Sequence, residues 1–173
     1  MKKLLMLLAL SLTLGAPAMA EMAGDFTILA PEIIFPGETK TFEFYTCNDS
    51  PDGEWATEVQ VRFPDNWNVI AGWYDDLGQG WDFDFMIDGE FGQYGRFLDA
   101  DGERGEIQDG QCGYFYITVS LHLNVDCIPV QLRAKQYGDG WGAEPHYFAD
   151  YLGYLLCVIP VEEGSWSTVK SLY

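Results

Sequence analysis

Hydrophobic and polar residues alternate along much of this chain, with the period of two that is typical of half-buried β-strands. Phenylalanines alternate with polar residues in the stretch 40–46, and Val59, Val61 and Phe63 follow the same pattern in the stretch 57–63. An acidic, turn-rich link separates the two stretches. We therefore predict two sequential antiparallel strands, which provide the packing surface for the strands that follow.

Further strands are predicted on both sides of this pair. Residues 25–34 form a short apolar run that ends at the turn signal Phe35-Pro36-Gly37, a pattern that suits an edge strand. Aromatic and aliphatic residues alternate mainly with aspartates in the stretch 81–88. The dipeptide Asp88-Gly89 then predicts a tight turn into a partner strand over 91–98.

The C-terminal half has the clearest alternation. The stretch 112–123 predicts a central strand with one wet face, and the stretches 128–135 and 147–159 predict a hairpin around the glycine-rich turn 138–142. No sustained helical period precedes the last residues. We therefore predict an all-β fold, an immunoglobulin-like antiparallel β-sandwich of about seven to nine strands. It spans residues 21–160 and is followed by a short C-terminal tail at 161–173.

Residues 1–20 have the three regions of a secretory signal peptide. Lys2 and Lys3 precede an apolar run, and small residues follow it up to Ala20. The run is too short to cross a bilayer, and a buried N-terminal helix is the less favoured alternative. We expect cleavage after Ala20 and a secreted protein, extracellular or periplasmic.

Four cysteines in an exported chain predict two disulfides. Cys112 and Cys127 lie at opposite ends of one predicted strand, about 35 Å apart, so they cannot bridge each other, and this also excludes the pairing of Cys47 with Cys157. If the strand beginning at Cys112 runs antiparallel to the strand ending at Cys47, these two residues meet. We predict the disulfides Cys47–Cys112 and Cys127–Cys157. A four-cysteine metal site is less favoured, because no Cys-x-x-Cys spacing occurs.

The formal net charge of -18 and a pI near 4.1 limit the classes of partner. Such a field repels phosphate backbones and anionic lipid headgroups, so nucleic-acid and membrane-surface binding are disfavoured. No later stretch has the length of a transmembrane helix, and we expect no membrane insertion. The remaining candidate partners are a glycan or a cell-surface protein.

Catalytic motifs are weak. His122 and His146 are the two histidines of the chain, and neither lies in a recognisable nucleophile motif. With 27 aspartates and glutamates, carboxylate pairs arise without catalytic meaning. We predict no enzyme activity and no required cofactor, with a small secreted polysaccharide hydrolase as the alternative.

One acidic segment is a candidate calcium site. Asp99, Asp101 and Glu103 surround Gly102, and clustered carboxylates with backbone carbonyls are the oxygen ligands that calcium prefers. The match to an EF-hand loop fails at its first and last ligands, which would be Phe97 and Gln108. A solvated acidic turn is the alternative interpretation.

Aromatic residues in or beside glycine-rich loops are the strongest indication of function. Flat rings on a rigid sandwich can stack on sugar faces while nearby polar groups bind hydroxyls. Trp81 shares a face with phenylalanines and is expected in the core. Packing of the loops against the sandwich is the alternative for the remaining rings. The candidate ligand-binding residues are Trp73, Tyr74, Tyr94, Trp141 and Tyr147.

The first half of the mature chain carries a loose family pattern. Pro36-Gly37-Glu38-Thr39 precedes a strand, an Asn-Asp-Ser link follows, and the valine-rich strand leads into Pro64-Asp65-Asn66-Trp67. This order resembles immunoglobulin-like modules of bacterial surface and secreted proteins, of the NEW3 and CARDB type. The resemblance implies a spacer, adhesive or carbohydrate-associated module without shared catalytic residues. The long acidic insert at 71–111 and the four cysteines depart from the pattern.

Together these observations predict a non-catalytic secreted or cell-surface module with a binding or structural role.

Overall fold

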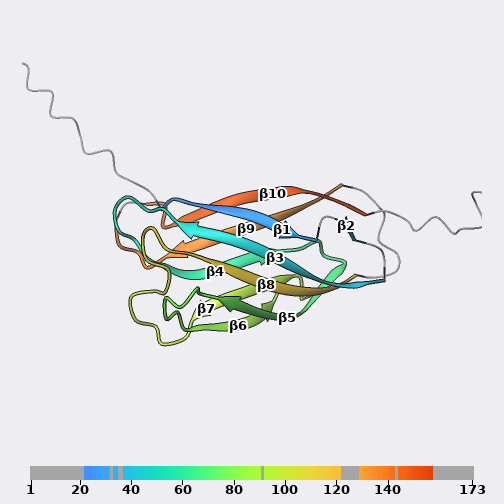
Figure 1. Ribbon diagram of the computed structural model, residues 1–173, viewed down its shortest axis with the longest axis horizontal. Helices are drawn as coiled ribbons and strands as arrows, with labels where there is room; N and C mark the ends of the chain where they lie inside the picture. Colours follow the sequence, from blue (N-terminus) through green and yellow to red (C-terminus); the bar gives the residue numbers. More distant parts are fainter. Residues whose placement is uncertain are drawn as a thin grey trace, which may run out of the picture.

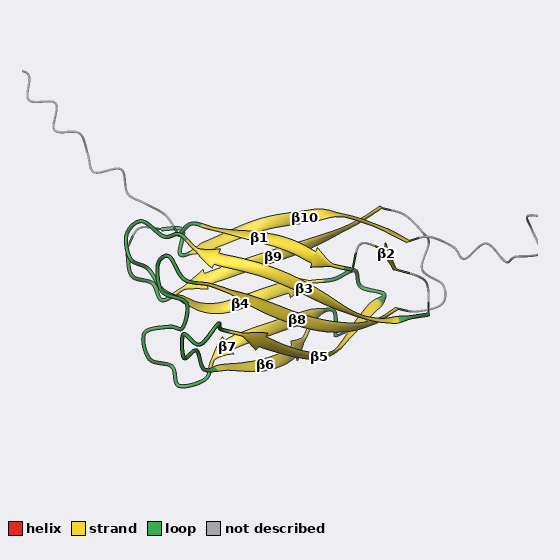
Figure 2. Cartoon of the chain, in the orientation of Figure 1, coloured by secondary structure: helices red, strands yellow, loops and turns green. Residues whose placement is uncertain are grey.

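The computed structural model describes residues 22–31, 33–34, 37–90, 92–121, 129–142 and 144–157. These residues form ten strands and no helix, arranged as two sheets that pack face to face (Figures 1 and 2). The predicted all-β antiparallel sandwich is therefore confirmed, with the two-residue β2 in addition to nine longer strands. The strands are β1 Gly24–Ala30, β2 Ile33–Ile34, β3 Thr39–Asn48, β4 Ala56–Arg62, β5 Trp67–Asp75, β6 Phe83–Asp88, β7 Tyr94–Asp99, β8 Cys112–Leu121, β9 Pro129–Gly138 and β10 Tyr147–Cys157.

The two sheets have four and six strands. The smaller has the order β1-β3-β8-β5 and the larger the order β2-β10-β9-β4-β7-β6. Neighbouring strands are antiparallel except for the short parallel contact of β2 with β10. The predicted hairpins β6–β7 and β9–β10 are both present, and Gly89 has a φ of 93° in the turn after β6.

The predicted pairing of β3 with β4 is wrong, because the two strands belong to different sheets. Phe42 and Phe44 instead meet Phe63 across the interior, with ring centroids 5.1 and 6.3 Å apart. The link between the strands crosses the end of the sandwich around buried Asn48. The Asn48 amide donates hydrogen bonds to the carbonyl oxygens of Glu54 and Ile107, at 2.8 and 2.7 Å.

Strand β5 was not among the predicted strands and contains an irregularity. Its pairing with β8 shifts by one residue between Val69 and Ala71, which is a β-bulge. Trp67 and Val69 face the core before the bulge. After it the parity is reversed, so that Trp73 points to solvent and Tyr74 points inward.

The core between the sheets is rich in aromatic rings. Phe97, Phe115 and Trp67 are fully buried, and Trp81 is buried as predicted. Trp81 lies on Gly113 of β8, where a Cβ atom would come within 2.5 Å of the indole ring. A glycine at this position therefore lets the indole lie directly against the sheet.

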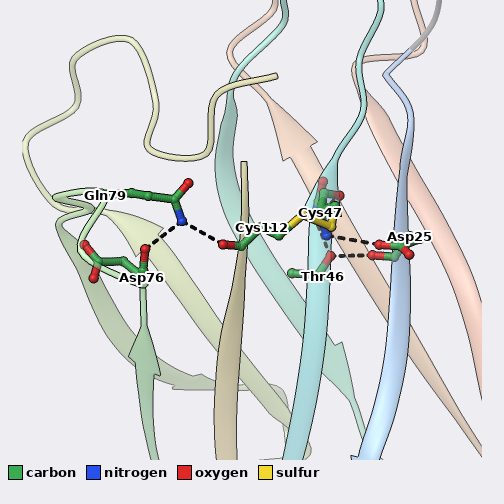
Figure 3. Close-up of a disulfide and its surroundings, with 7 residues drawn as sticks. Asp25, Thr46, Cys47, Asp76, Gln79 and Cys112 are labelled. Atoms are coloured by element: carbon green, nitrogen blue, oxygen red, sulfur yellow. Dashed lines mark hydrogen bonds between the residues drawn. A yellow bond between two sulfur atoms is a disulfide. The ribbon is translucent and has the colours of Figure 1, made fainter. Parts of the chain in front are cut away.

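The disulfide between Cys47 and Cys112 is present, as predicted (Figure 3). Both residues occupy paired positions of β3 and β8. The backbone N–H of Cys47 also donates to the Asp25 carboxylate at 3.1 Å, which joins β1 to the same end of the sheet. On the other side, the Gln79 side chain donates to the carbonyl oxygen of Cys112 at 2.7 Å.

Three predictions fall outside what the structure describes. The signal peptide at 1–20 and the tail at 161–173 lie outside the described residues, as does Cys127 of the second predicted disulfide. The side chain of its partner Cys157 is likewise not described. Among the described residues, no helix is long and apolar enough to cross a membrane.

Candidate functional site

Four aromatic side chains lie together on the outer face of the four-stranded sheet. We call Tyr45, Trp73, Tyr114 and Tyr116 the aromatic platform. Trp73 is 48% exposed and stacks on Tyr116, with ring centroids 5.2 Å apart and an angle of 9° between the planes. Tyr45 and Tyr114 form a second pair at 5.0 Å. The platform thus consists of two ring pairs on one face of the sheet, with Trp73 as its most exposed ring.

Strand register explains why these rings meet. Tyr45 pairs with Tyr114 between β3 and β8, and Trp73 pairs with Tyr116 between β5 and β8. Side chains of directly opposed residues in an antiparallel pair lie about 5 Å apart, within reach of ring contact. The bulge in β5 is essential, because without it Trp73 would point into the core.

Polar groups border the aromatic platform. Glu43 pairs with Tyr116, and Asp75 pairs with Tyr114. The hydroxyl groups of Thr41 and Thr118 share a hydrogen bond of 2.9 Å one row further along the sheet. Rings flanked by carboxylates and hydroxyls supply both an apolar surface and hydrogen-bonding groups at its edge.

The platform's central tyrosine is held in its neutral form. Burial raises the pKa of the Tyr116 phenol, and the negative charges of Glu43 and Asp75 raise it further. The phenol therefore keeps its proton at neutral and mildly alkaline pH. It can donate a hydrogen bond to a ligand oxygen.

The predicted ligand-binding residues do not form one site. Trp73 is part of the platform, whereas Tyr74 packs in the core against Phe115 and donates its hydroxyl hydrogen to the Trp81 carbonyl oxygen at 2.9 Å. Trp141 is 62% exposed on the loop after β9, where the Arg104 guanidinium lies 5.6 Å from its ring centroid.

The other two predicted residues, Tyr94 and Tyr147, lie on β7 and β10 of the larger sheet. Neither strand belongs to the platform's sheet.

Sequence reasoning did not single out Tyr45, Tyr114 and Tyr116 as ligand-binding residues. The alternation in the stretch 112–123 predicted one wet face for this strand, and Tyr114 and Tyr116 lie on that face. The missing information was which strand lies beside β8, since that strand brings Trp73 to them. An exposed tryptophan beside outward-facing tyrosines can be recognised only when the order of the strands in the sheet is known.

The acidic segment after β7 brings carboxylates together. Asp99, Asp101 and Glu106 place ligand oxygens within 4.8 Å of one another, and we call them the acidic cluster. Glu103, which the sequence suggested, is not a member, and Glu106 takes that place. Burial raises the pKa of Glu106, and the charges of Asp99 and Asp101 add to the shift. Within the described residues, the carboxylates of this acidic cluster lie close enough together to hold a cation.

His146 pairs with Glu54 at the end of the sandwich. Its Nδ1 lies 2.9 Å from the Glu54 carboxylate, which has no exposed surface and also accepts the N–H of Gly140 at 3.3 Å. Burial raises the pKa of Glu54, while the hydrogen bond and charge of His146 lower it. The pair fixes the β9–β10 turn, a structural role that leaves the carboxylate closed to substrate.

The fold of this chain is similar to that of several solved structures. The major pilin subunit BcpA of Bacillus cereus, in its D312A form, superimposes with a TM-score of 0.55 at 11% identity over 80% of this chain. This chain corresponds to 40% of that pilin's length. The seventh ScaB type I cohesin from Pseudobacteroides cellulosolvens gives a TM-score of 0.52 at 12% identity, covering 81% of this chain and 95% of the cohesin.

No protein-family model and no curated protein sequence matches this chain. The similarity to the pilin and the cohesin therefore concerns the β-sandwich fold alone.

Proposed function

We propose that this protein is a non-catalytic, extracellular binding module that holds a neutral glycan on its aromatic platform. The exposed Trp73 ring, stacked on the half-buried ring of Tyr116, is the observation that carries this proposal. The C–H groups on one face of a sugar ring pack well on a flat aromatic surface. A cohesin and a pilin subunit share the fold, which supports a module that binds or assembles outside the cell. The Cys47–Cys112 disulfide supports the same compartment.

The platform combines rigidity with accessible polar groups. Its rings project from three neighbouring strands, so their spacing is set by the sheet and little conformational entropy is lost on binding. Glu43, Asp75 and the phenol of Tyr116 can bind hydroxyl groups at the edges of a stacked sugar. These features favour recognition of a sugar surface by a preformed site.

The arrangement of carboxylates favours binding over hydrolysis. Glu43 and Asp75 lie on β3 and β5, with β8 between them. Because neighbouring strands lie about 5 Å apart, the backbones of β3 and β5 are separated by about 10 Å. The tyrosines of β8 project between the two acids. Glycoside hydrolysis generally requires two carboxyl groups about 5 to 9.5 Å apart on opposite sides of the scissile bond. This geometry gives no support to the alternative of a polysaccharide hydrolase.

Binding to an array of neutral oligosaccharides, followed by calorimetric titration with the tightest of them, tests the proposal. Trp73→Ala is expected to weaken binding at least about tenfold, because loss of a stacking contact of about 1–3 kcal/mol changes affinity by that factor or more. Trp141→Ala removes another exposed indole and serves as the matched control with unchanged affinity.

A reducing-sugar assay on the same glycans separates the rival functions. We expect no release of product over the period in which binding saturates. Turnover that is lost in Glu43→Gln or Asp75→Asn would establish a hydrolase instead. Absence of binding to every array member, or equal loss in Trp73→Ala and Trp141→Ala, would contradict the aromatic platform as the binding site.

A further inference from the structure

The outer face of the six-stranded sheet concentrates positive charge in an acidic protein. Of the nine lysines and arginines in the sequence, Lys2, Lys3 and Lys170 lie outside the described residues, which leaves six. Four of these six lie on neighbouring strands β4, β7 and β9. We call them the cationic face: Arg62, Arg96, Arg133 and Lys135.

Register places like charges side by side. Arg62 of β4 is directly opposite Arg133 of β9, and Lys135 is opposite Gln60 two residues along. Like charges in directly opposed positions are destabilising in an antiparallel pair. An anion bound between the two strands would relieve this repulsion.

Two members of the cationic face are already neutralised by carboxylates. Arg96 donates to both oxygens of Glu58 at 2.7 and 2.9 Å and to Asp88 at 2.8 Å. Arg62 makes an exposed ion pair with Asp65 at 3.1 Å. The carboxylates of Glu58, Asp65 and Asp88 are thus engaged by these two arginines.

The other two members, Arg133 and Lys135, have no carboxylate partner in the described part of the chain. The Arg133 guanidinium lies 5.6 Å from the Tyr151 ring centroid, and the Lys135 ammonium lies 5.0 Å from the Tyr137 centroid. The Nε atom of Arg133 is buried and makes no hydrogen bond within the described residues. A buried donor without an acceptor costs free energy that a ligand oxygen would recover.

Arg133, Lys135 and Tyr137 line a pocket of about 300 Å³. Its volume suits one sugar-sized ligand, at the lower end of the range for small-molecule sites. It combines cations with two phenol rings and one amide, and the Asp88 carboxylate at its rim is already bonded to Arg96. The lining residues are Gln60, Arg62, Asp88, Gly89, Tyr94, Arg133, Lys135 and Tyr137.

We infer that this pocket binds the carboxylate of a sugar acid, one uronic-acid unit in size. Arg133 and Lys135 bind the carboxylate, and Arg62 adds positive charge from the facing strand. The rings of Tyr94 and Tyr137 contact the sugar, and the Gln60 amide and the phenol hydroxyls bind its other oxygens. This site is separate from the aromatic platform, which lies on the opposite sheet.

Two features favour a sugar acid over other anions. The pocket lies over β9, β4 and β7, which are interior strands, so their backbone groups are used in the sheet and cannot pair with an added peptide strand. The charge of -18 on the whole chain repels polyanions that extend beyond the pocket. One carboxylate on a compact, hydroxylated ring meets both conditions.

Amide chemical-shift titration of the full chain with sodium D-glucuronate at low ionic strength tests this inference. Shifts are expected at residues of β4, β7 and β9 around the pocket. Arg133→Met, which keeps the apolar stem of the side chain, is expected to weaken binding at least about tenfold through loss of a charge-assisted contact. Lys135→Met should have a similar effect, whereas Arg104→Met, a cation at the end of the sandwich, is the matched control.

Three comparisons can overturn the inference. Methyl glucoside, which lacks the carboxylate, should bind at least about tenfold more weakly. N-acetylglutamate, which lacks the sugar ring, should also bind more weakly, and equal or tighter binding would indicate an acidic peptide as the ligand. Trp73→Ala must leave glucuronate binding unchanged, so failure of the proposed function and failure of this site are distinguishable. Absence of shifts around the pocket would refute the site.

Discussion

At the scale of single residues, the bulge between Val69 and Ala71 decides which aromatic side chain of β5 faces solvent. It reverses the parity of β5, so that Trp73 faces solvent beside Tyr116 while Tyr74 completes the core. The sequence shows two adjacent aromatic residues and gives no sign of which one is exposed. A register shift of one residue is enough to exchange their roles.

Glu54 predicts a specific dependence of stability on pH. Burial raises its folded pKa above the ordinary value of 4.5, with the His146 contact acting in the opposite direction. The stabilising contribution is therefore fully present below pH 4.5 and is lost as pH rises through the folded pKa. We expect the free energy of unfolding of the wild type, relative to that of Glu54→Gln, to fall as the pH rises from 4.5 through the folded pKa of Glu54.

Urea unfolding at a series of pH values measures that difference. The same comparison in a His146→Gln background removes the contribution of the imidazole. Parallel pH profiles for the wild type and Glu54→Gln would show that the carboxylate is not perturbed as we describe.

The acidic cluster predicts stabilisation by calcium. A cation would offset the repulsion among Asp99, Asp101 and Glu106, which burial of Glu106 intensifies. We expect 1 mM calcium, roughly ten times a typical dissociation constant for a site of moderate affinity, to raise the melting temperature by about 3 °C. Glu106→Gln should abolish the rise, whereas Glu103→Gln should leave it intact. A melting temperature that is insensitive to calcium and to excess chelator would remove this site.

At the scale of elements, alternation identified most strands but not their sheets. The patterns of β6 to β10 reflect burial of one face, a local property that the sequence records directly. Whether β3 pairs with β4 or faces it depends on the path of the link around Asn48, which is set by a hydrogen bond to Glu54 within the link and a long-range hydrogen bond to Ile107. For the same reason, the outward position of Tyr114 and Tyr116 was predictable, and the position of Trp73 beside them was not.

The disulfide between β3 and β8 predicts a large effect on stability. It closes a loop with a sequence separation of 65 residues. Chain-entropy arguments for a loop of this size give a contribution of about 4 kcal/mol. The double variant Cys47→Ala/Cys112→Ala is expected to lose about that amount in urea unfolding, with Cys127 and Cys157 unchanged. A loss below about 1 kcal/mol would show that the hydrogen bonds around Asp25 and Gln79 hold this end without the bridge.

At the scale of the whole molecule, charge is unevenly distributed. The chain carries -18, yet four cations gather on one sheet face. Self-repulsion among the remaining acids destabilises the compact state, and salt screens it. We therefore expect the melting temperature to rise by about 2 °C or more between 20 and 200 mM sodium chloride. Choline chloride at matched ionic strength should give the same rise, and a fall with salt would contradict the argument.

The described chain enters β1 at one end of the sandwich and leaves β10 at the opposite end (Figure 1). A pulling force applied between Gly24 and Cys157 would therefore act nearly parallel to the strands. Loaded in this direction, the hydrogen bonds of β1 with β3 and of β10 with β9 must shear together rather than open one after another. We therefore expect the domain to resist a force along the strands more strongly than a force applied across them.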